Sequence, residues 1–258
     1  MAFFVYLIVG FLGGLIGGLL GTGGCVIMMP VVRFGFHFPP PAAVGTTLTA
    51  VVFTAASGAI QHIKLKNVDK RTAIIVGCSG VLGVIIGSLI FGYIKSYGKL
   101  IDFILGWAFL IVSLRILYEG LFAKTVSPQQ IGSIPGRTIW KSFLGSIIGI
   151  LTGIIGLGGG YALVPSFIYF LNAPVKLAIG TSMASFVWIA FVGAIFKFFQ
   201  GVVNIPAASA LGIGAIGGAI LGARLTGKFK PNVLKTLFGV IFLYVALKYI
   251  LIYFGLAI

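Results

Sequence analysis

Apolar runs long enough to cross a lipid bilayer recur along this chain from residue 3 to residue 254. One helical crossing of the hydrocarbon core needs about 20 predominantly apolar residues. The chain is 59% hydrophobic and only 8% charged, whereas a soluble domain carries roughly 25% charged residues. Water cannot solvate so apolar a surface, so the sequence predicts an all-α, multi-pass protein of the cell (inner or plasma) membrane.

The few charged residues are strongly biased toward positive charge. The formal net charge is +15, with 18 Lys and Arg against three acidic residues. The basic residues lie mainly between the apolar runs, which is typical of loop charges that fix membrane orientation, and a cationic surround also attracts anions. A nucleic-acid-binding chain would place them on a soluble face. We therefore expect the lipid bilayer and a small anion as partners, with no nucleic acid, and a homo-oligomer is left open.

The chain is an internal duplication with an offset of 135 residues. Residues 21–95 align with 156–230 without a gap, and 21 of these 75 positions are identical, nine of them as glycine. Glycine matches could arise from composition alone, but the match of Pro30 with Pro165 is harder to attribute to composition. The predicted organisation is a first repeat over 1–122, a cytoplasmic linker over 123–141 and a second repeat over 142–258.

Each repeat opens with an apolar stretch that exceeds one crossing, 3–38 and 142–172. As one helix, the first would be about 54 Å long at 1.5 Å per residue, against a hydrocarbon core of about 30 Å. A glycine run interrupts each stretch, so we expect a Gly-broken helical hairpin followed by three transmembrane helices. An odd number of crossings inverts the second repeat relative to the first. The expected helices are 42–63, 72–94 and 100–122, then 177–199, 207–229 and 233–254.

The distribution of basic residues favours this inverted repeat. With the loop 64–71 inside, the inverted arrangement places twelve basic residues inside and four outside, whereas a parallel arrangement divides the same sixteen into eight and eight. Excess positive charge marks the cytoplasmic side. The twelve are Lys64, Lys66, Lys70, Arg71, Lys124, Arg137, Lys141, Lys176, Arg224, Lys228, Lys230 and Lys235, and the four are Arg33, Lys95, Lys99 and Lys197.

The glycine runs are the first candidate binding site. Close helix packing is one explanation, because glycine lets backbones approach. The other is a broken helix whose free N–H groups and positive dipole end bind an anion. A dinucleotide loop is excluded, because no βαβ unit surrounds the runs and no acidic residue follows about 20 residues later. The candidates are Gly21, Thr22, Gly23, Gly24, Gly156, Gly158, Gly159 and Gly160.

Two pairs of hydroxyl residues form the second candidate site. Thr46 with Thr47, and Thr181 with Ser182, each follow a glycine near the start of an expected helix. Such hydroxyls commonly cap a helix or bond back to its carbonyls. They could also act as neutral donors to an oxyanion, which holds the anion without a fixed charge and leaves its release easy.

These motifs resemble the sulfite exporter TauE/SafE family. The second repeat carries them as the run 156–165 followed by Ala-Ile-Gly-Thr-Ser at 178–182, and the first as 21–30 followed by Ala-Val-Gly-Thr-Thr at 43–47. The resemblance spans nearly the whole chain. It implies membrane transport, typically export, of sulfite, sulfonates or other small organosulfur and organic anions. Thr47 departs from the common Ser but keeps the hydroxyl.

The scarce acidic and histidine residues give no sign of catalysis. Asp69 lies in an expected loop, Asp102 and Glu119 lie near helix ends, and His37 and His62 are expected at the membrane interface. We therefore expect no enzyme, no cofactor and no metal. Proton-coupled carriers often use an intramembrane carboxylate, and none is expected here. The function predicted is a potential-driven or facilitated secondary transporter of a small anion, with an anion channel of the same architecture as the alternative.

The inverted arrangement predicts that both termini lie outside the cytoplasm. A periplasmic reporter enzyme fused to the N-terminus should be active, and a fluorescent protein that matures only in the cytoplasm should be dark at the same position. A cytoplasmic N-terminus would contradict the arrangement.

Overall fold

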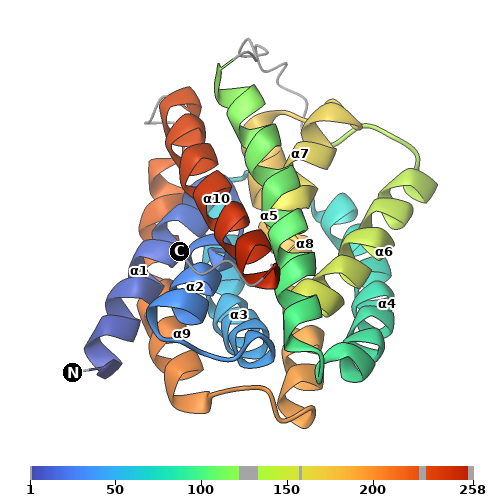
Figure 1. The fold of residues 1–258 in the computed structure, drawn as a ribbon. Helices are drawn as coiled ribbons and strands as arrows, with labels where there is room; N and C mark the ends of the chain where they lie inside the picture. Colours follow the sequence, from blue (N-terminus) through green and yellow to red (C-terminus); the bar gives the residue numbers. More distant parts are fainter. Residues whose placement is uncertain (1, 122–132, 157–158, 227–230, 255–258) are drawn as a thin grey trace. The chain divides into compact units, whose positions relative to one another are not determined.

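The computed structural model describes residues 2–121, 133–156, 159–226 and 231–254. The regular elements in these ranges are all helices (Figure 1). Six of them are long and apolar enough to cross a membrane, which confirms the prediction of an all-α membrane protein. These six are α1 (Ala2–Leu20), α3 (Pro40–Lys64), α4 (Lys70–Ile94), α6 (Thr138–Ile155), α8 (Val175–Phe199) and α9 (Ile205–Leu225).

Both long apolar stretches are interrupted at their glycines, as predicted. Gly21 and Gly156 follow α1 and α6 with φ of 73° and 70°, a left-handed conformation that favours glycine and commonly ends a helix. Gly158 lies outside the described residues. The chain resumes as α2 (Cys25–Pro30), which continues into the π-helical turn η1 (Val31–Gly35), and as α7 (Gly160–Tyr169).

The chain reverses direction at the first break. Gly24 packs against Gly13 of α1, which lies eleven residues earlier in the sequence, and a Cβ added at Gly13 would lie 2.8 Å from Met28 Cε. The short helix α2 therefore lies back against α1, as the hairpin prediction requires. The equivalent contact in the second repeat brings Gly159 to Ile148, where an added Cβ would lie 2.8 Å from Ile148 Cγ2.

Two compact units make up the fold, one over Met1–Gly92 and Pro128–Thr226, the other over Tyr93–Ser127 and Gly227–Ile258. The second contains α5 (Gly98–Leu121) and α10 (Pro231–Tyr253), whose Phe109 and Tyr249 rings stack with centroids 5.8 Å apart. Each of these helices comes from a different predicted repeat. Each unit therefore contains parts of both predicted repeats. The boundaries of the repeats stay a prediction, and so do the membrane crossings of α5 and α10.

Glycines bring pairs of helices from different repeats into close contact within the first unit. A Cβ added at Gly14 of α1 would overlap the Ala215 carbonyl of α9, and one added at Gly149 of α6 would overlap the Gly80 carbonyl of α4. The offset of 135 residues pairs Gly149 with Gly14 and Ala215 with Gly80, so the two contacts occupy equivalent positions in the two repeats. Such small-residue contacts let membrane helices approach closely.

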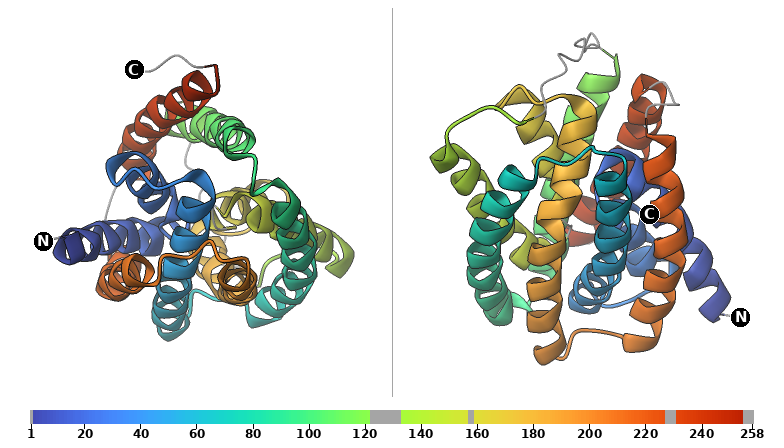
Figure 2. Two further views of the ribbon diagram at one scale, coloured as in Figure 1. Left: turned by 60° about the horizontal axis from the view of Figure 1, so that its bottom comes forward. Right: turned by 180° about the vertical axis from the view of Figure 1, so that it is seen from behind.

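Helices α3 and α8 pack together and run antiparallel. Asn204, which follows the end of α8, donates its backbone N–H to Thr46 near the start of α3 at 3.0 Å. Asp69, which follows the end of α3, donates its backbone N–H to Thr181 near the start of α8 at 2.9 Å. The right view of Figure 2 shows the α3–α4 connection at the top and the α8–α9 connection at the bottom.

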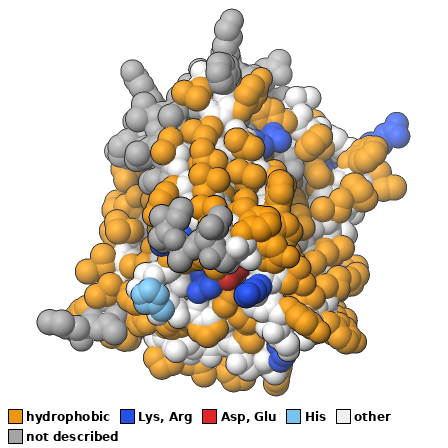
Figure 3. All heavy atoms as spheres, in the orientation of Figure 1, with side chains coloured by type: hydrophobic (Ala, Val, Ile, Leu, Met, Phe, Trp, Pro, Cys, Tyr) orange, Lys and Arg blue, Asp and Glu red, His pale blue; other side chains and the backbone are white. Residues whose placement is uncertain are grey.

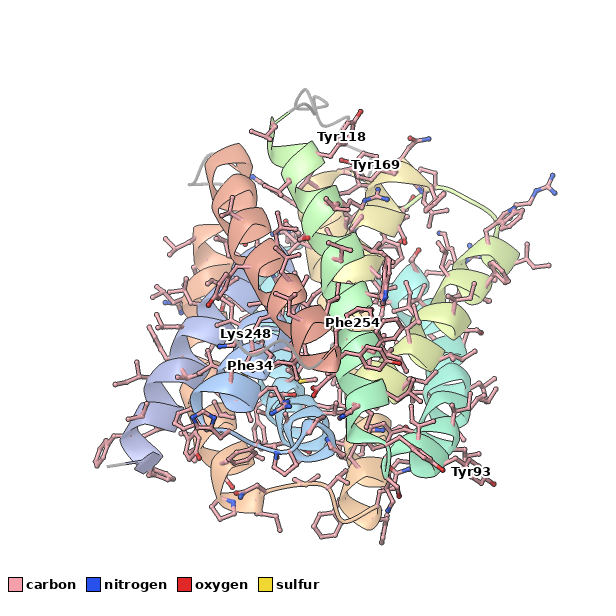
Figure 4. All side chains as sticks on the ribbon, in the orientation of Figure 1. Phe34, Tyr93, Tyr118, Tyr169, Lys248 and Phe254 are labelled. Carbon is pink, nitrogen blue, oxygen red and sulfur yellow. The ribbon has the colours of Figure 1, made fainter. Side chains whose placement is uncertain are left out.

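Apolar side chains cover most of the face shown in Figure 3, as expected for a protein solvated by lipid. Tyr93, near the end of α4, is 83% exposed and projects outward (Figure 4). Tyrosines in such positions are enriched at the membrane–water interface, where the ring is buried in the headgroup region and the hydroxyl stays hydrated.

The glycine contact between α1 and α9 predicts a position-specific effect of added methyl groups. Gly14→Ala should lower the free energy of unfolding by about 1–3 kcal/mol, because the new Cβ meets backbone that cannot move freely. Gly217→Ala, also in α9, is the matched control, because its Cβ would lie 3.7 Å from the Phe11 ring, an ordinary contact. Thermal unfolding of both purified variants in detergent measures the difference, and equal midpoints would contradict the prediction.

Candidate functional site

The two glycine breaks meet beside the middle of α3 and α8. A Cβ added at Gly23 would lie 3.0 Å from Val51 Cγ1 of α3 and 3.4 Å from Phe186 Cε1 of α8. Gly160, from the second break, packs directly on Gly21 and Thr22 of the first. Both contacts fall near the middle of α3 and α8, which are each long enough to span a membrane. Transporters with broken helices hold their substrates near the middle of the bilayer.

The helices that leave the breaks begin without side-chain caps. Neither α2, after Gly24, nor α7, after Gly159, receives a hydrogen bond from a capping side chain. Thr22 lies in the first break, is 8% exposed, and its Oγ1 has no hydrogen-bond partner among the described residues. A helix N-terminus is the positive end of the dipole. The break thus combines an unpaired hydroxyl with a favourable potential for negative charge.

Among the described residues, one of the four predicted hydroxyl residues, Ser182, hydrogen-bonds to a break. Ser182 donates to the Gly21 carbonyl at 3.1 Å and to Ile179 of its own helix at 2.8 Å. Thr47, at the equivalent position of the first repeat, donates to the Ala43 carbonyl at 2.6 Å. Ser182 therefore links α8 to the first break, whereas the Thr47 hydroxyl bonds back to its own helix and also contacts Met29 Sδ of α2 at 3.3 Å.

The other two hydroxyl residues, Thr46 and Thr181, hold loops. Each is fully buried and accepts the backbone N–H of the residue that caps a helix of the other repeat, Asn204 for Thr46 and Asp69 for Thr181. In this structure they fix the α8–α9 and α3–α4 connections. A role as anion ligands stays a prediction for these two residues.

Two basic residues that the sequence placed at the surface are buried. Lys197, counted among the outside basic residues at the end of the expected helix 177–199, donates to the Gly153 carbonyl at 2.6 Å and lies 3.2 Å from the centroid of the Phe91 ring. His62, expected at the interface, is fully buried with Nε2 at 3.0 Å from the Gly18 carbonyl. Both side chains are buried rather than exposed at the surface, because the last turns of α3 and α8 face the ends of α1 and α6. One feature of the sequence could have indicated these contacts: the 135-residue offset pairs His62 with Lys197 and Gly18 with Gly153.

Asp69 is the centre of a buried polar cluster that also contains Thr72, Ile134 and Lys141. Its carboxylate accepts hydrogen bonds from Thr72 Oγ1 at 2.6 Å and from the backbone N–H of Ile134 at 2.9 Å. Lys141 donates to Thr72 Oγ1 at 2.7 Å and to the Ile134 carbonyl at 2.6 Å. Lys141, counted in the linker, is thus buried in α6, which begins at Thr138 and so includes the last four residues of the predicted linker. This cluster ties the segment before α6 to the start of α4.

The environment of Asp69 changes its acidity. Burial acts to raise its pKa, but hydrogen bonds from Thr72 and Ile134 and the positive charge of Lys141 together outweigh burial, so the pKa lies below its ordinary value. No group of three or more His, Cys, Asp or Glu residues within the described ranges could hold a metal ion.

The lowered pKa of Asp69 predicts a component of stability that acid removes. Because the folded pKa lies below the unfolded value of about 3.9, this component is present above that value and is lost as the pH falls through the folded pKa. Asp69→Asn lacks it. The difference in thermal unfolding midpoint between wild type and variant, measured from pH 7 to pH 3, should therefore shrink as the pH falls. A difference independent of pH would contradict this account.

Comparison with known proteins places the chain in a family. The sulfite exporter TauE/SafE family matches residues 6–249. Probable membrane transporter proteins resemble the chain along nearly its whole length: YunE of Bacillus subtilis is 26% identical, with 99% of each chain covered, and a protein of Xylella fastidiosa is 28% identical, with 91% of each covered. No solved structure matches the chain. The protein belongs to the sulfite exporter TauE/SafE family of membrane transporters.

Proposed function

We propose that the protein is a secondary transporter that exports a small anion such as sulfite, a sulfonate or a related organosulfur or organic anion. The observation that carries this proposal is the meeting of the two breaks beside the middle of α3 and α8. There the uncapped start of α2 and the unpaired Thr22 hydroxyl offer donors to a negative guest. The family name supplies the class of substrate.

We also propose that the two repeats have opposite orientations in the cell (inner) membrane. Support comes from the exchanged loop contacts, in which Asn204 bonds Thr46 and Asp69 bonds Thr181, and from the opposite ends at which the two loops lie in Figure 2. Inverted repeats allow alternating access, because each repeat can adopt the conformation of the other around a fixed central site.

Export needs no proton in this proposal. An inside-negative membrane potential drives each negative charge outward with about 2.3 kcal/mol per 100 mV. Asp69 of the first unit is held in a structural cluster, since its carboxylate caps the start of α4 and accepts the backbone N–H of Ile134.

Burial of the break favours a carrier over the alternative, an anion channel. Gly21, Thr22, Gly23 and Gly24 are all buried, whereas a conducting channel requires a continuous hydrated path. A carrier must pass through a state in which its site is closed to both sides, and a buried site of this kind fits that requirement.

Flux through reconstituted protein tests the proposal. Proteoliposomes loaded with unlabelled sulfite should accumulate labelled sulfite by counterflow, with saturable kinetics. Flux that rises linearly with concentration and shows no counterflow would favour the channel. Absence of flux for sulfite, sulfoacetate and thiosulfate alike would contradict the proposed substrate class.

The unpaired hydroxyl of Thr22 gives a residue-level prediction for the same assay. Thr22→Val keeps the shape of the side chain and should raise the KM for the transported anion by about tenfold, because one hydrogen bond to a charged guest is lost. Thr49→Val is the matched control, since the Thr49 hydroxyl already bonds the Gly45 carbonyl at 2.8 Å. Equal KM values for the two variants would exclude Thr22 as a ligand.

A further inference from the structure

A buried cation lies at the last turn of α6, directly before the second break. The Lys197 side chain is fully buried and donates to the carbonyl of Gly153, three residues before Gly156. Its other recorded neighbour is the face of the Phe91 ring, and no carboxylate of the described residues pairs with it. An ionisable group inside a membrane span is costly and usually functional. Within the described residues, no carboxylate therefore competes with an anionic guest for this amine.

Two unpaired hydroxyls accompany this cation. Thr152 precedes Gly153 in α6, and Ser88 of α4 packs against the same turn, with its backbone nitrogen 2.6 Å from a Cβ added at Gly153. Both side chains are almost fully buried, and neither hydroxyl oxygen has a hydrogen-bond partner among the described residues. A buried hydroxyl without a partner is destabilising, and a bound ion or water can supply that partner.

The first repeat provides an internal comparison that lacks these hydroxyls. Applying the offset of 135 residues, Thr152 corresponds to Gly17, Ser88 to Ala223 and Lys197 to His62. His62 repeats the hydrogen bond to a carbonyl at the end of the broken helix, with Gly18 in place of Gly153. Capping that carbonyl therefore needs only a basic group. The two hydroxyls of the second repeat are additional, and helix capping does not explain them.

We propose that Lys197, Ser88 and Thr152 form an anion-binding station at the end of α6 that the transported oxyanion occupies next to the second break. This inference rests on the proposed function and deepens it. The ammonium supplies the countercharge and the hydroxyls donate to the anion oxygens. In the unliganded protein the Gly153 carbonyl holds the ammonium in place, so a guest replaces a neutral partner of Lys197.

Binding to the purified full-length protein in detergent tests the station, with sulfite and sulfoacetate as probes. Lys197→Gln keeps an N–H donor for the Gly153 carbonyl but removes the charge, and it should weaken anion binding by about tenfold or more. Ser88→Ala should weaken binding by several-fold, whereas Lys197→Arg should retain most of it. Isothermal calorimetry gives the affinities, and the unliganded thermal midpoint reports folding separately.

Two matched controls separate the station from general effects. Lys64→Met removes an exposed charge two residues from His62, and Ser57→Ala removes a buried hydroxyl that bonds the Phe53 carbonyl at 2.7 Å. Both should bind the probes as wild type does. The double variant His62→Lys with Lys197→Gln moves the charge to the equivalent position of the other repeat, where the hydroxyls are missing, and it should recover only part of the affinity.

The outcomes distinguish this inference from the proposed function. If wild type binds sulfite or sulfoacetate and both Lys197→Gln and Ser88→Ala bind equally well, the station is overturned while anion transport stands. If Lys197→Gln does not fold, Ser88→Ala decides alone, and wild-type affinity in that variant overturns the station. If wild type binds neither probe and transports neither, the proposed function fails and the station fails with it.

Discussion

Backbone groups exposed by a broken helix cannot be left unpaired in a membrane, because lipid offers them no hydrogen bonds. Each break here frees carbonyls at the end of one helix and N–H groups at the start of the next. The protein treats the two ends differently. His62 and Lys197 bond carbonyls in the last turns of α1 and α6, whereas α2 and α7 begin without side-chain caps. The N–H groups at the start of α2 and α7 therefore have no side-chain cap, and in the proposed function they face the anion.

Close packing of small residues is what holds the breaks at their depth. Apolar helices gain little from contacting each other rather than lipid, so their association depends on close van der Waals contact. Glycines provide it where α1 of the first repeat meets α9 of the second, and where α6 of the second meets α4 of the first. Each helix that leads into a break therefore packs closely against a helix of the other predicted repeat.

The sequence predicted the helices to within a few residues, and it located both breaks, because hydropathy and glycine runs depend on local composition. It misplaced His62, Lys141 and Lys197. Hydropathy assigns a charged residue near a helix end to the interface, whereas burial depends on which helix packs against that turn. The offset of the repeat pairs His62 with Lys197, but only tertiary contacts show that Gly18 and Gly153 receive them. Removing Lys141 from the inside count and Lys197 from the outside count leaves the excess of positive charge inside.

Differences between the repeats set the energetics of a transporter of this kind. If the repeats were identical and exchanged conformations, the two resulting states would have equal free energy, so any preference must arise where the repeats differ. The loop contacts differ in this way. Within the described residues, the Asn204 side chain accepts one hydrogen bond, from the backbone N–H of Ala207, whereas Asp69, at the equivalent position, bonds Thr72 and Ile134 in a cluster with Lys141. The α3–α4 loop is therefore held by a charged cluster that has no counterpart at the α8–α9 loop among the described residues, and in the proposed mechanism this difference would favour one state over the other.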